Sequence, residues 1–423
     1  MNGLLPRILI MAIASTTLPV LAEVEPGFNT QVTLQASRNN GMDTWLNGGY
    51  GRFSHGDDSQ SDTAFNGRID LGYKARFWQN FEISTHLQAR QGSGDDERDA
   101  LGLVTMKLRY VQATAEQQRL MVTLGQFFLP TSMENTDPFW ESPYTITYSS
   151  MNSWIGEEFR PIGIDLDYRW TLADKQQFKL AATAFQGNDS MGAMLAWRGW
   201  SYGNHLSVYG ETLALPDLYS LQEPNAFAIQ NDSGSTPVTG DFDGDIGFAL
   251  RGSWRLNSDT QVKLTHVDNN GDKGLHNDPG DGEYAWRTRF TLVGFESAPA
   301  PNVTFLGEYM SGSSIMGATP THVDIDFESL YLLTSLRQND WRYSLRYDTF
   351  SITDRDLLKQ DPNWDDGESL TFAVFWQQAR SKLSLGAEVL ALDSERKRVI
   401  VDGTLLQNPR DQLQFSLQAR YRL

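Results

Sequence analysis

Hydrophobic and polar residues alternate with a period of two along many short stretches of this chain. The clearest stretch is 412–423, where every second residue from Leu413 to Leu423 is apolar or aromatic and the residues between are Gln, Ser or Arg. Successive side chains of a β-strand point to opposite faces. The pattern therefore predicts a strand with one face suited to lipid and the other to water.

Further stretches of this kind are centred near residues 32, 71, 86, 108, 124, 166, 181, 195, 208, 250, 264, 290, 306, 330, 346, 373 and 387. We predict an all-β fold, a transmembrane antiparallel up-and-down β-barrel of about 18 strands. A barrel of about 16 strands is the alternative, because the stretches near 195 and 208 are weak. Short connections alternate with long polar ones, which indicates short periplasmic turns and long extracellular loops. A soluble propeller or sandwich would also have alternating strands.

The first 22 residues differ from the rest of the chain. They begin with one Arg and no acid, continue with a short apolar stretch and end in Val20-Leu21-Ala22. Such a segment is typical of a secretory signal peptide, and its apolar part is short for a membrane anchor helix. We therefore predict a signal peptide over 1–22, a barrel over 23–423 and a location in a Gram-negative outer membrane.

Composition supports a barrel. Aromatic residues make up 12% of the chain, with 12 Trp, 15 Tyr and 22 Phe, although the mean hydropathy is −0.43. Barrels place such rings at the two membrane interfaces and keep a polar lumen. The absence of cysteine excludes disulfides and cysteine ligands. The net charge of −18 argues against a nucleic-acid partner.

The connection 129–160 is long and rich in aromatic rings and acids. A loop with so many rings is a poor candidate for free solvation, because exposed apolar patches usually bind something. We expect it to fold into the lumen and narrow the pore; the alternative is that its rings pack on the barrel rim or on a neighbouring subunit. The candidate residues for pore constriction and solute contact are Trp140, Tyr144, Tyr148, Trp154, Glu157, Glu158 and Arg160.

The flanks of this loop carry a family resemblance. Gly125-Gln126-Phe127 ends one strand, and Arg160-Pro161-Ile162-Gly163-Ile164 begins the next. Together with the loop between them, over about residues 124–166, they resemble the phosphate-selective porin family. The resemblance implies a homotrimer of barrels, each with an inward-folded loop and a basic pore.

Charged residues at lumen-facing positions are expected to set ion preference. Alternation assigns more basic than acidic residues to the wall, and Asp324, Asp326 and Glu328 are among the acids. Many of these charges are expected to pair and brace the wall. The basic residues that we single out for the lumen wall are Arg68, Arg90, Arg109, Arg251, Arg287, Arg289 and Arg346.

Other chemistry is weakly indicated. Asp241, Asp243 and Asp245 have the oxygen-donor spacing that hard cations accept, without the closing Glu of an EF-hand, so they are weak metal candidates. The histidines accompany no Gly-x-Ser-x-Gly or His-Glu-x-x-His motif. We therefore predict neither an enzyme nor a cofactor.

These observations predict a porin through which small hydrophilic solutes or ions diffuse passively. The alternative is a non-conducting surface receptor or adhesin barrel, which the acidic extracellular loops would suit. The expected partners are outer-membrane lipid, lipopolysaccharide, small hydrophilic solutes and further copies of the chain in a homotrimer.

Overall fold

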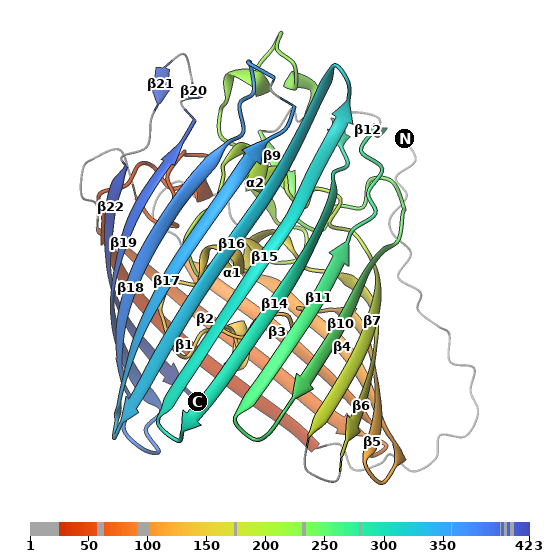
Figure 1. The fold of residues 1–423 in the computed structure, drawn as a ribbon, viewed down its shortest axis with the longest axis vertical. Helices are drawn as coiled ribbons and strands as arrows, with labels where there is room; N and C mark the ends of the chain where they lie inside the picture. The colour runs from red at the N-terminus through yellow and green to blue at the C-terminus, as the bar shows by residue number, and fades with distance from the viewer. Residues whose placement is uncertain are drawn as a thin grey trace.

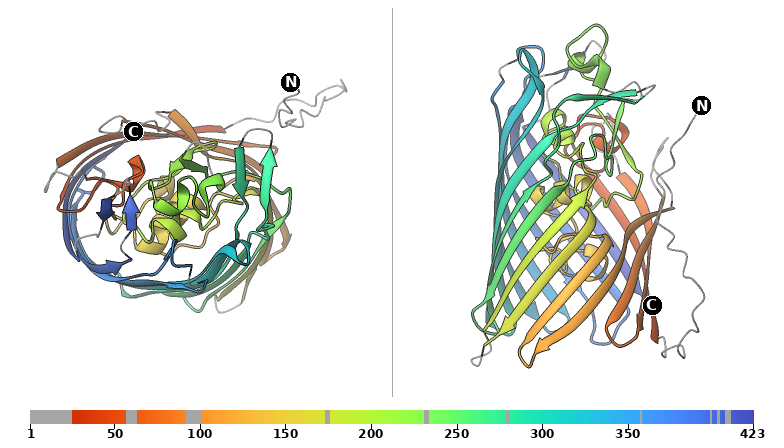
Figure 2. Two further views of the ribbon diagram at one scale, coloured as in Figure 1. Left: turned by 90° about the horizontal axis from the view of Figure 1, so that it is seen from above. Right: turned by 90° about the vertical axis from the view of Figure 1, so that its right-hand side faces the viewer.

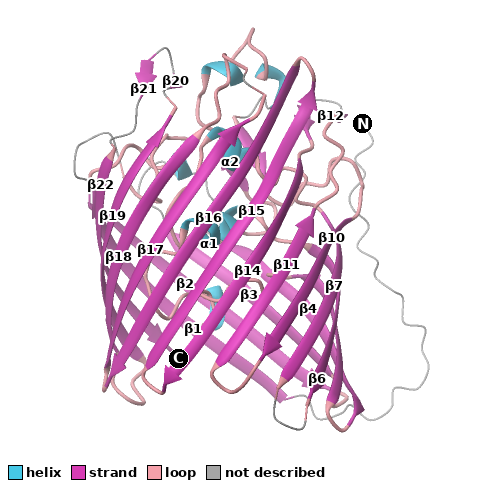
Figure 3. Ribbon diagram, viewed as in Figure 1, coloured by secondary structure: helices cyan, strands magenta, loops and turns pink. Residues whose placement is uncertain are grey.

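Sixteen antiparallel strands close into one barrel in the computed structural model of this protein (Figures 1 and 3). The structure describes residues 25–423 except 57–62, 92–100, 173–175, 231–233, 279–280, 357, 398, 402–403 and 407–409. The predicted signal peptide, residues 1–22, lies outside the described residues. The predicted fold class is confirmed, with sixteen strands, the alternative count, in place of eighteen.

Each barrel strand pairs with the next one along the chain, and the last strand pairs with the first. Ser37 and Ser416 lie on this seam with their hydroxyl oxygens 2.9 Å apart, so the closed barrel leaves no free edge. The barrel strands are β1 (Glu25–Asn39), β2 (Thr63–Phe77), β3 (Phe81–Gln91), β4 (Leu101–Ala115), β5 (Gln118–Gln126), β6 (Ile162–Thr171), β7 (Gln177–Gln186), β10 (Gly247–Arg255), β11 (Thr260–Asp268), β14 (Arg287–Ala300), β15 (Val303–Ala318), β16 (Thr321–Gln338), β17 (Trp341–Asp354), β18 (Asp365–Trp376), β19 (Leu383–Arg396) and β22 (Asp411–Arg422).

Smaller elements lie in the long connections. The short two-stranded sheets are β8 (Thr212–Ala214) with β9 (Ser235–Pro237), β12 (Leu275–Asp278) with β13 (Asp281–Tyr284), and β20 (Val399–Val401) with β21 (Thr404–Leu406). The helices are α1 (Ser150–Glu158), α2 (Ala193–Trp197) and the 3-10 turns η1 (Trp45–Asn47), η2 (Pro138–Trp140), η3 (Tyr219–Leu221) and η4 (Ala228–Gln230). Within the described part of the chain, no helix has both the length and the apolar character needed to cross a membrane.

The predicted strands near 195 and 208 are wrong. Residues 193–197 form helix α2, and residues 203–208 belong to no regular element. Both lie inside the barrel, where Leu195, Trp197, Leu206 and Val208 are at most 1% exposed. A segment that is buried on every side has no lipid face, so its apolar residues follow the packing of a core and do not mark a strand.

The outer face of the barrel is an apolar belt. Leu34, Leu250, Leu332 and Leu417 point outward and are 59%, 56%, 56% and 63% exposed. Phe77 and Phe81, which flank the short turn 78–80, stack at 5.7 Å at the lower edge of the belt. An apolar band bounded by aromatic rings matches a bilayer, because lipid tails cover the apolar side chains and the aromatic rings lie among the headgroups.

The inner face changes character along the tall strands β14–β19. In the upper part of β16, Val323, Ile325 and Phe327 are buried and point inward, where they join a hydrophobic core inside the lumen. The residues between them therefore point outward. This corrects the prediction for five residues, which lie on the outer face and not on the lumen wall: Arg287, Arg289, Asp324, Asp326 and Glu328.

Candidate functional site

Three connections fold into the lumen, and we call residues 40–56, 127–161 and 187–208 the plug. Figure 2 shows them as the inner segments seen from above, enclosed by the ring of strands. Most of their buried apolar side chains join those of the upper wall in one continuous core. Tyr148, Leu206 and Val208 form a smaller cluster with Val104 of the wall. The loop 129–160 thus lies inside the barrel, together with a second long connection and a third shorter one that the sequence did not single out.

Helix α1 forms the centre of the plug. Its Ser149 N-cap hydroxyl accepts a hydrogen bond from the Asn152 amide at 3.4 Å. All nine residues of the helix are buried. The ring of Trp154 packs edge-on against Phe290 and Phe327 of the wall, each 5.4 Å away between centroids. Aromatic packing of this kind fixes the plug to strands β14 and β16.

Buried charges on β17 and β19, which follow β16 around the barrel, also hold the plug. Arg346 of β17 is fully buried and donates to Glu134 at 2.6 Å and to Asp348 at 2.8 Å. Glu388 of β19 accepts from the backbone amides of Ile146 at 2.6 Å and Thr147 at 3.1 Å. A buried charge is tolerated where partners and hydrogen bonds satisfy it. Arg346, predicted as a charge of the lumen wall, is therefore a support for the plug.

Two more of the predicted wall arginines bind the plug. Arg68 pairs with Asp70 beside it at 2.9 Å and with Glu141 of the plug. Arg90 donates to the carbonyl of Leu206 at 3.0 Å. The other two that point inward behave differently: Arg251 pairs with Asp165 at 2.5 Å, and Arg109 lies 3.6 Å from Glu82 with its side chain 30% exposed.

The predicted constriction residues Trp154, Glu157 and Glu158 are enclosed within the plug. Glu157 pairs with Arg198 at 2.9 Å and accepts from the Ser201 hydroxyl at 3.0 Å. Glu158 accepts from the amide of Met194 at 3.0 Å and from the indole of Trp154. Burial raises the pKa of Glu158 to about 7, against the lowering effect of Arg198. These carboxylates hold two plug segments together in this structure.

Three of the other predicted constriction residues, Trp140, Tyr148 and Arg160, form a stack with Phe128 on the underside of the plug. The Arg160 guanidinium lies 3.5 Å from the centre of the Phe128 ring, and burial lowers the pKa of Arg160 to about 9. The Trp140 ring stacks on the Phe128 ring with their centroids 4.4 Å apart, and the Tyr148 ring meets Trp140 edge-on. Tyr144 lies elsewhere on the same side, with Arg342 5.0 Å from its ring centre.

Beneath the plug, toward the short turns, the lumen is hollow. A cavity of about 700 Å³ is lined by Phe139, Trp140, Lys107 and Lys263 among others. A second, of about 340 Å³, shares Lys263 and Pro130 with the first. A third, of about 190 Å³, shares Asp137 with the first. We call these three adjoining cavities the vestibule.

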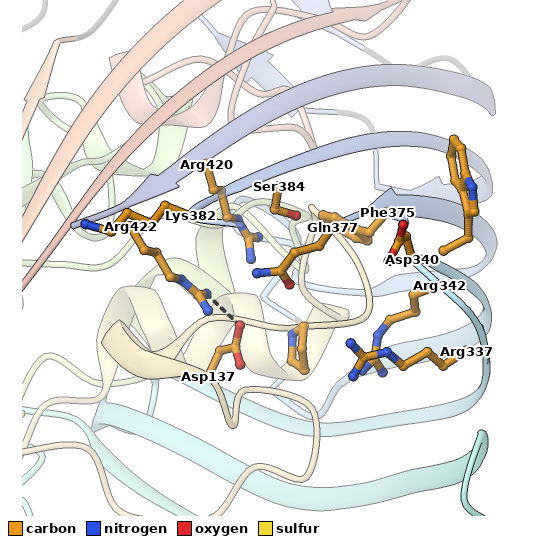
Figure 4. A pocket seen from close by; sticks show the side chains of 12 residues that line it. Asp137, Arg337, Asp340, Arg342, Phe375, Gln377, Lys382, Ser384, Arg420 and Arg422 are labelled. Carbon is orange, nitrogen blue, oxygen red and sulfur yellow. Dashed lines mark hydrogen bonds and ion pairs between the residues drawn. The ribbon is translucent and has the colours of Figure 1, made fainter. Parts of the chain in front are cut away.

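The lining of the vestibule is basic, although Lys74, Lys179 and Arg251 pair with the carboxylates of Glu82, Asp167 and Asp165. Its described lining includes twelve Lys or Arg residues and three Asp or Glu residues. In the third cavity Arg337, Arg342 and Arg420 turn toward the hollow from β16, β17 and β22, and Arg422 pairs with Asp137 at 2.7 Å (Figure 4). The twelve are Lys74, Lys107, Arg169, Lys179, Arg251, Arg255, Lys263, Arg337, Arg342, Lys382, Arg420 and Arg422.

Of this set, only Arg251 is among the wall arginines that the sequence singled out. Period-two alternation assigns the others, except Arg337, to the lumen wall, because each lies beside an outward apolar neighbour in its strand. Alternation does not tell how far along its strand a side chain lies. That position decides whether the side chain lies beneath the plug or is covered by it.

The predicted metal candidates are partly brought together. One oxygen each of Asp189, Asp241 and Asp243 lie within 4.8 Å of one another, whereas Asp245 is not in this group. Burial, and next the nearby acids, raise the pKa of Asp189 to about 6, while the amide of Phe242 donates to its carboxylate at 2.5 Å. Asp189 stands in a different segment, so the spacing of the aspartates could not reveal it.

Comparison with known proteins shows the class of fold. No family model matches the chain, and no curated protein matches it in sequence. Among solved structures, it is similar to the anion-selective porin from Comamonas acidovorans, with 11% identity and a TM-score of 0.51 over 95% of this chain and 100% of that one. The fold is that of the outer-membrane porins.

Two further structures agree. The outer membrane channel DcaP of Acinetobacter baumannii has 10% identity and a TM-score of 0.51, over 95% of this chain and 97% of that one. OmpF of Salmonella typhi, solved in complex with daunomycin, has 11% identity and a TM-score of 0.51, over 95% and 98%. At such identities the likeness concerns the course of the barrel strands.

Proposed function

We propose that this protein is an outer-membrane diffusion channel for small hydrophilic solutes and that it favours anions. The observation that carries the proposal is the vestibule, where twelve basic side chains and three acidic ones line adjoining cavities. Walls of low dielectric constant focus the field of such charges and concentrate counter-ions. Phosphate, which the resemblance to phosphate-selective porins implies, is one anion that this vestibule suits.

We infer that solutes pass beside the plug and not through its apolar core. The wall formed by β22 and β1 presents glutamine and serine side chains to the plug. The Oε1 atoms of Gln414 and Gln418 are buried and have no hydrogen-bond partner among the described residues. Buried acceptors of this kind are normally satisfied by water. A wet strip along this wall would connect the vestibule with the extracellular side.

Planar-bilayer recording tests the channel. We expect discrete conductance steps, with a reversal potential in a KCl gradient that indicates chloride preference. The double variant Lys107→Glu/Lys263→Glu, with both changes in the vestibule, should shift the reversal potential toward cations. The matched control Lys273→Glu/Lys359→Glu alters charge equally at exposed extracellular positions and should shift it far less. Equal shifts in the two variants, or chloride preference unchanged in both, would contradict the proposal.

A non-conducting receptor is the second candidate, and the apolar core of the plug favours it. Deleting residues 130–160 separates the two functions. A channel narrowed by the plug should conduct more after the deletion, because the vestibule then opens upward. A receptor barrel, closed by residues 187–208 as well, should show no conductance steps before or after the deletion.

We also propose that three barrels associate, as the family resemblance implies. The exposed apolar belt offers the surface that such contacts would use. Light scattering of the detergent-solubilised protein, corrected for bound detergent, distinguishes a trimer from a monomer.

A further inference from the structure

A polar hollow of about 470 Å³ lies on the outer face of the barrel, and we call it the outer groove. It crosses strands β11 and β14–β17 near their extracellular ends. In its upper row Arg289, Ser313, Asp326 and Thr353 stand directly opposite one another in register. In the row below, Thr291, Ser311, Glu328 and Ser351 do the same.

The row beneath the groove fixes its height in the membrane. Val293, Tyr309 and Leu330 occupy that row, and Val293 and Tyr309 are 49% and 41% exposed on the apolar belt. The Tyr309 hydroxyl donates upward to Glu328 at 2.9 Å. Tyrosine takes this position at a membrane interface, with its ring in lipid and its hydroxyl in the headgroup layer. The outer groove therefore lies at headgroup level, immediately above the hydrocarbon.

The hollow results from small side chains between large ones. Ser311 and Ser313 of β15 form the floor. Arg289 of β14 stands on one side, and Arg355 stands on the other, where its Nε donates to Asp326 of β16 at 2.6 Å. Two strand spacings, roughly 10 Å, separate β14 from β16, whose Asp326 holds the Arg355 guanidinium. A sugar ring that carries a phosphate has about this width.

Arg289 is the cation available to a ligand. Its Nε donates to the Ser313 hydroxyl at 3.2 Å, and among the described residues it forms no ion pair. Its two terminal nitrogens can therefore bind a phosphate in the bidentate manner that arginine favours. The hydroxyls of the floor and the carboxylates of Asp326 and Glu328 match the hydroxyl groups of a sugar.

We propose that the outer groove binds the phosphorylated sugar headgroup of a glycolipid in the outer leaflet. At this height on the outside of the barrel the neighbour is a lipid headgroup. A row of hydroxyls and carboxylates beside an arginine suits a sugar phosphate better than a glycerol phosphate. This binding needs a folded barrel but not an open pore, so it stands independently of conduction.

Native mass spectrometry of the purified full chain with diphosphorylated lipid A tests the proposal. We expect one lipid A per barrel to be retained, and its affinity to fall about tenfold in Arg289→Gln, because a charge-assisted bidentate contact is lost. The control Arg410→Gln removes another exposed, outward arginine at the same end of the barrel and should leave affinity unchanged. Lipid A without its phosphates, and phosphatidylglycerol, should both bind at least tenfold more weakly than diphosphorylated lipid A.

Several results would overturn the proposal. Equal losses in Arg289→Gln and Arg410→Gln would mean diffuse attraction to the rim. Phosphatidylglycerol bound as tightly as lipid A would mean a general lipid site. Displacement of lipid A by millimolar inorganic phosphate would mean a simple anion site. A second variant, Ser313→Leu, fills the floor without changing charge and should also weaken binding; unchanged affinity there would place the lipid elsewhere.

Discussion

At the scale of single residues, the plug depends on buried ion pairs. Glu157 and Arg198 are both fully buried and lie 2.9 Å apart, one in helix α1 and the other just after α2. The carboxylate pKa is raised by burial, although Arg198 opposes this. The pair therefore links two plug segments at a high desolvation cost that only the intact contact offsets.

Replacing Arg198 by Met should loosen the plug. The change leaves Glu157 buried without its cation, and losing one partner of a buried pair costs about 3–5 kcal/mol. We expect faster amide hydrogen exchange in residues 150–158 and 193–197 and an unchanged barrel. Arg410→Met, at an exposed pair, is the control. Exchange rates in α1 that match those of the control would show that the pair contributes little.

Sequence could locate the important segment but not the roles of its residues. Trp154, Glu157 and Glu158 lie in the ring-rich loop that was expected to enter the lumen. Acids in a pore loop are ordinarily expected to face water, and here they face Arg198 and Met194. Those partners stand some forty residues later, in a stretch read as a strand, so no local pattern could pair them.

At the scale of elements, the plug contains a group that titrates near neutral pH. The folded-state pKa of Glu158, about 7, lies above its ordinary value of 4.5. A raised carboxyl pKa means that the folded plug binds this proton more tightly than the unfolded segment does. The stabilisation of the folded plug by this bound proton is thus complete below pH 4.5 and is lost as the pH rises through 7. The free energy of unfolding changes by roughly 3 kcal/mol at most.

We therefore expect the plug to be more dynamic at pH 8 than at pH 5. Bilayer recordings should show longer closed periods at pH 5. Glu158→Gln, which cannot ionise, should bring the closed periods at pH 8 closer to those at pH 5. A residual dependence is expected from Asp189 and Glu157, whose pKa values are also raised. The same pH dependence in wild type and Glu158→Gln would assign the effect to another group.

Alternation located the sixteen barrel strands because each has one lipid-facing side. It failed where that condition fails. The segment 187–208 is enclosed, so α2 was read as a strand. The upper part of β16 stands above the belt, so its outer side carries Asp324, Asp326 and Glu328 and its inner side is apolar. The rule that polar residues face the lumen holds only at the height of the bilayer.

At the scale of the whole molecule, charge is divided between two regions. The chain carries a net −18, yet the vestibule is basic and the acids lie mainly in the extracellular part. Ion preference should therefore depend on salt, because the Debye length falls from about 10 Å at 0.1 M to about 3 Å at 1 M. We expect the chloride-to-potassium permeability ratio to be larger at 0.1 M KCl than at 1 M. A ratio independent of salt would indicate selection by contact alone.

The position of the plug along the chain has a consequence for assembly. All three plug segments are synthesised before β14–β19, the strands whose inner sides carry the apolar residues that cover them. The seam between β1 and β22 needs the last strand of all. We therefore expect the plug to pack against an open, curved sheet before β22 pairs with β1 and closes the barrel. A plug that docked after closure would have to enter a completed barrel. Until it did so, the apolar inner side of the upper strands would be exposed to water.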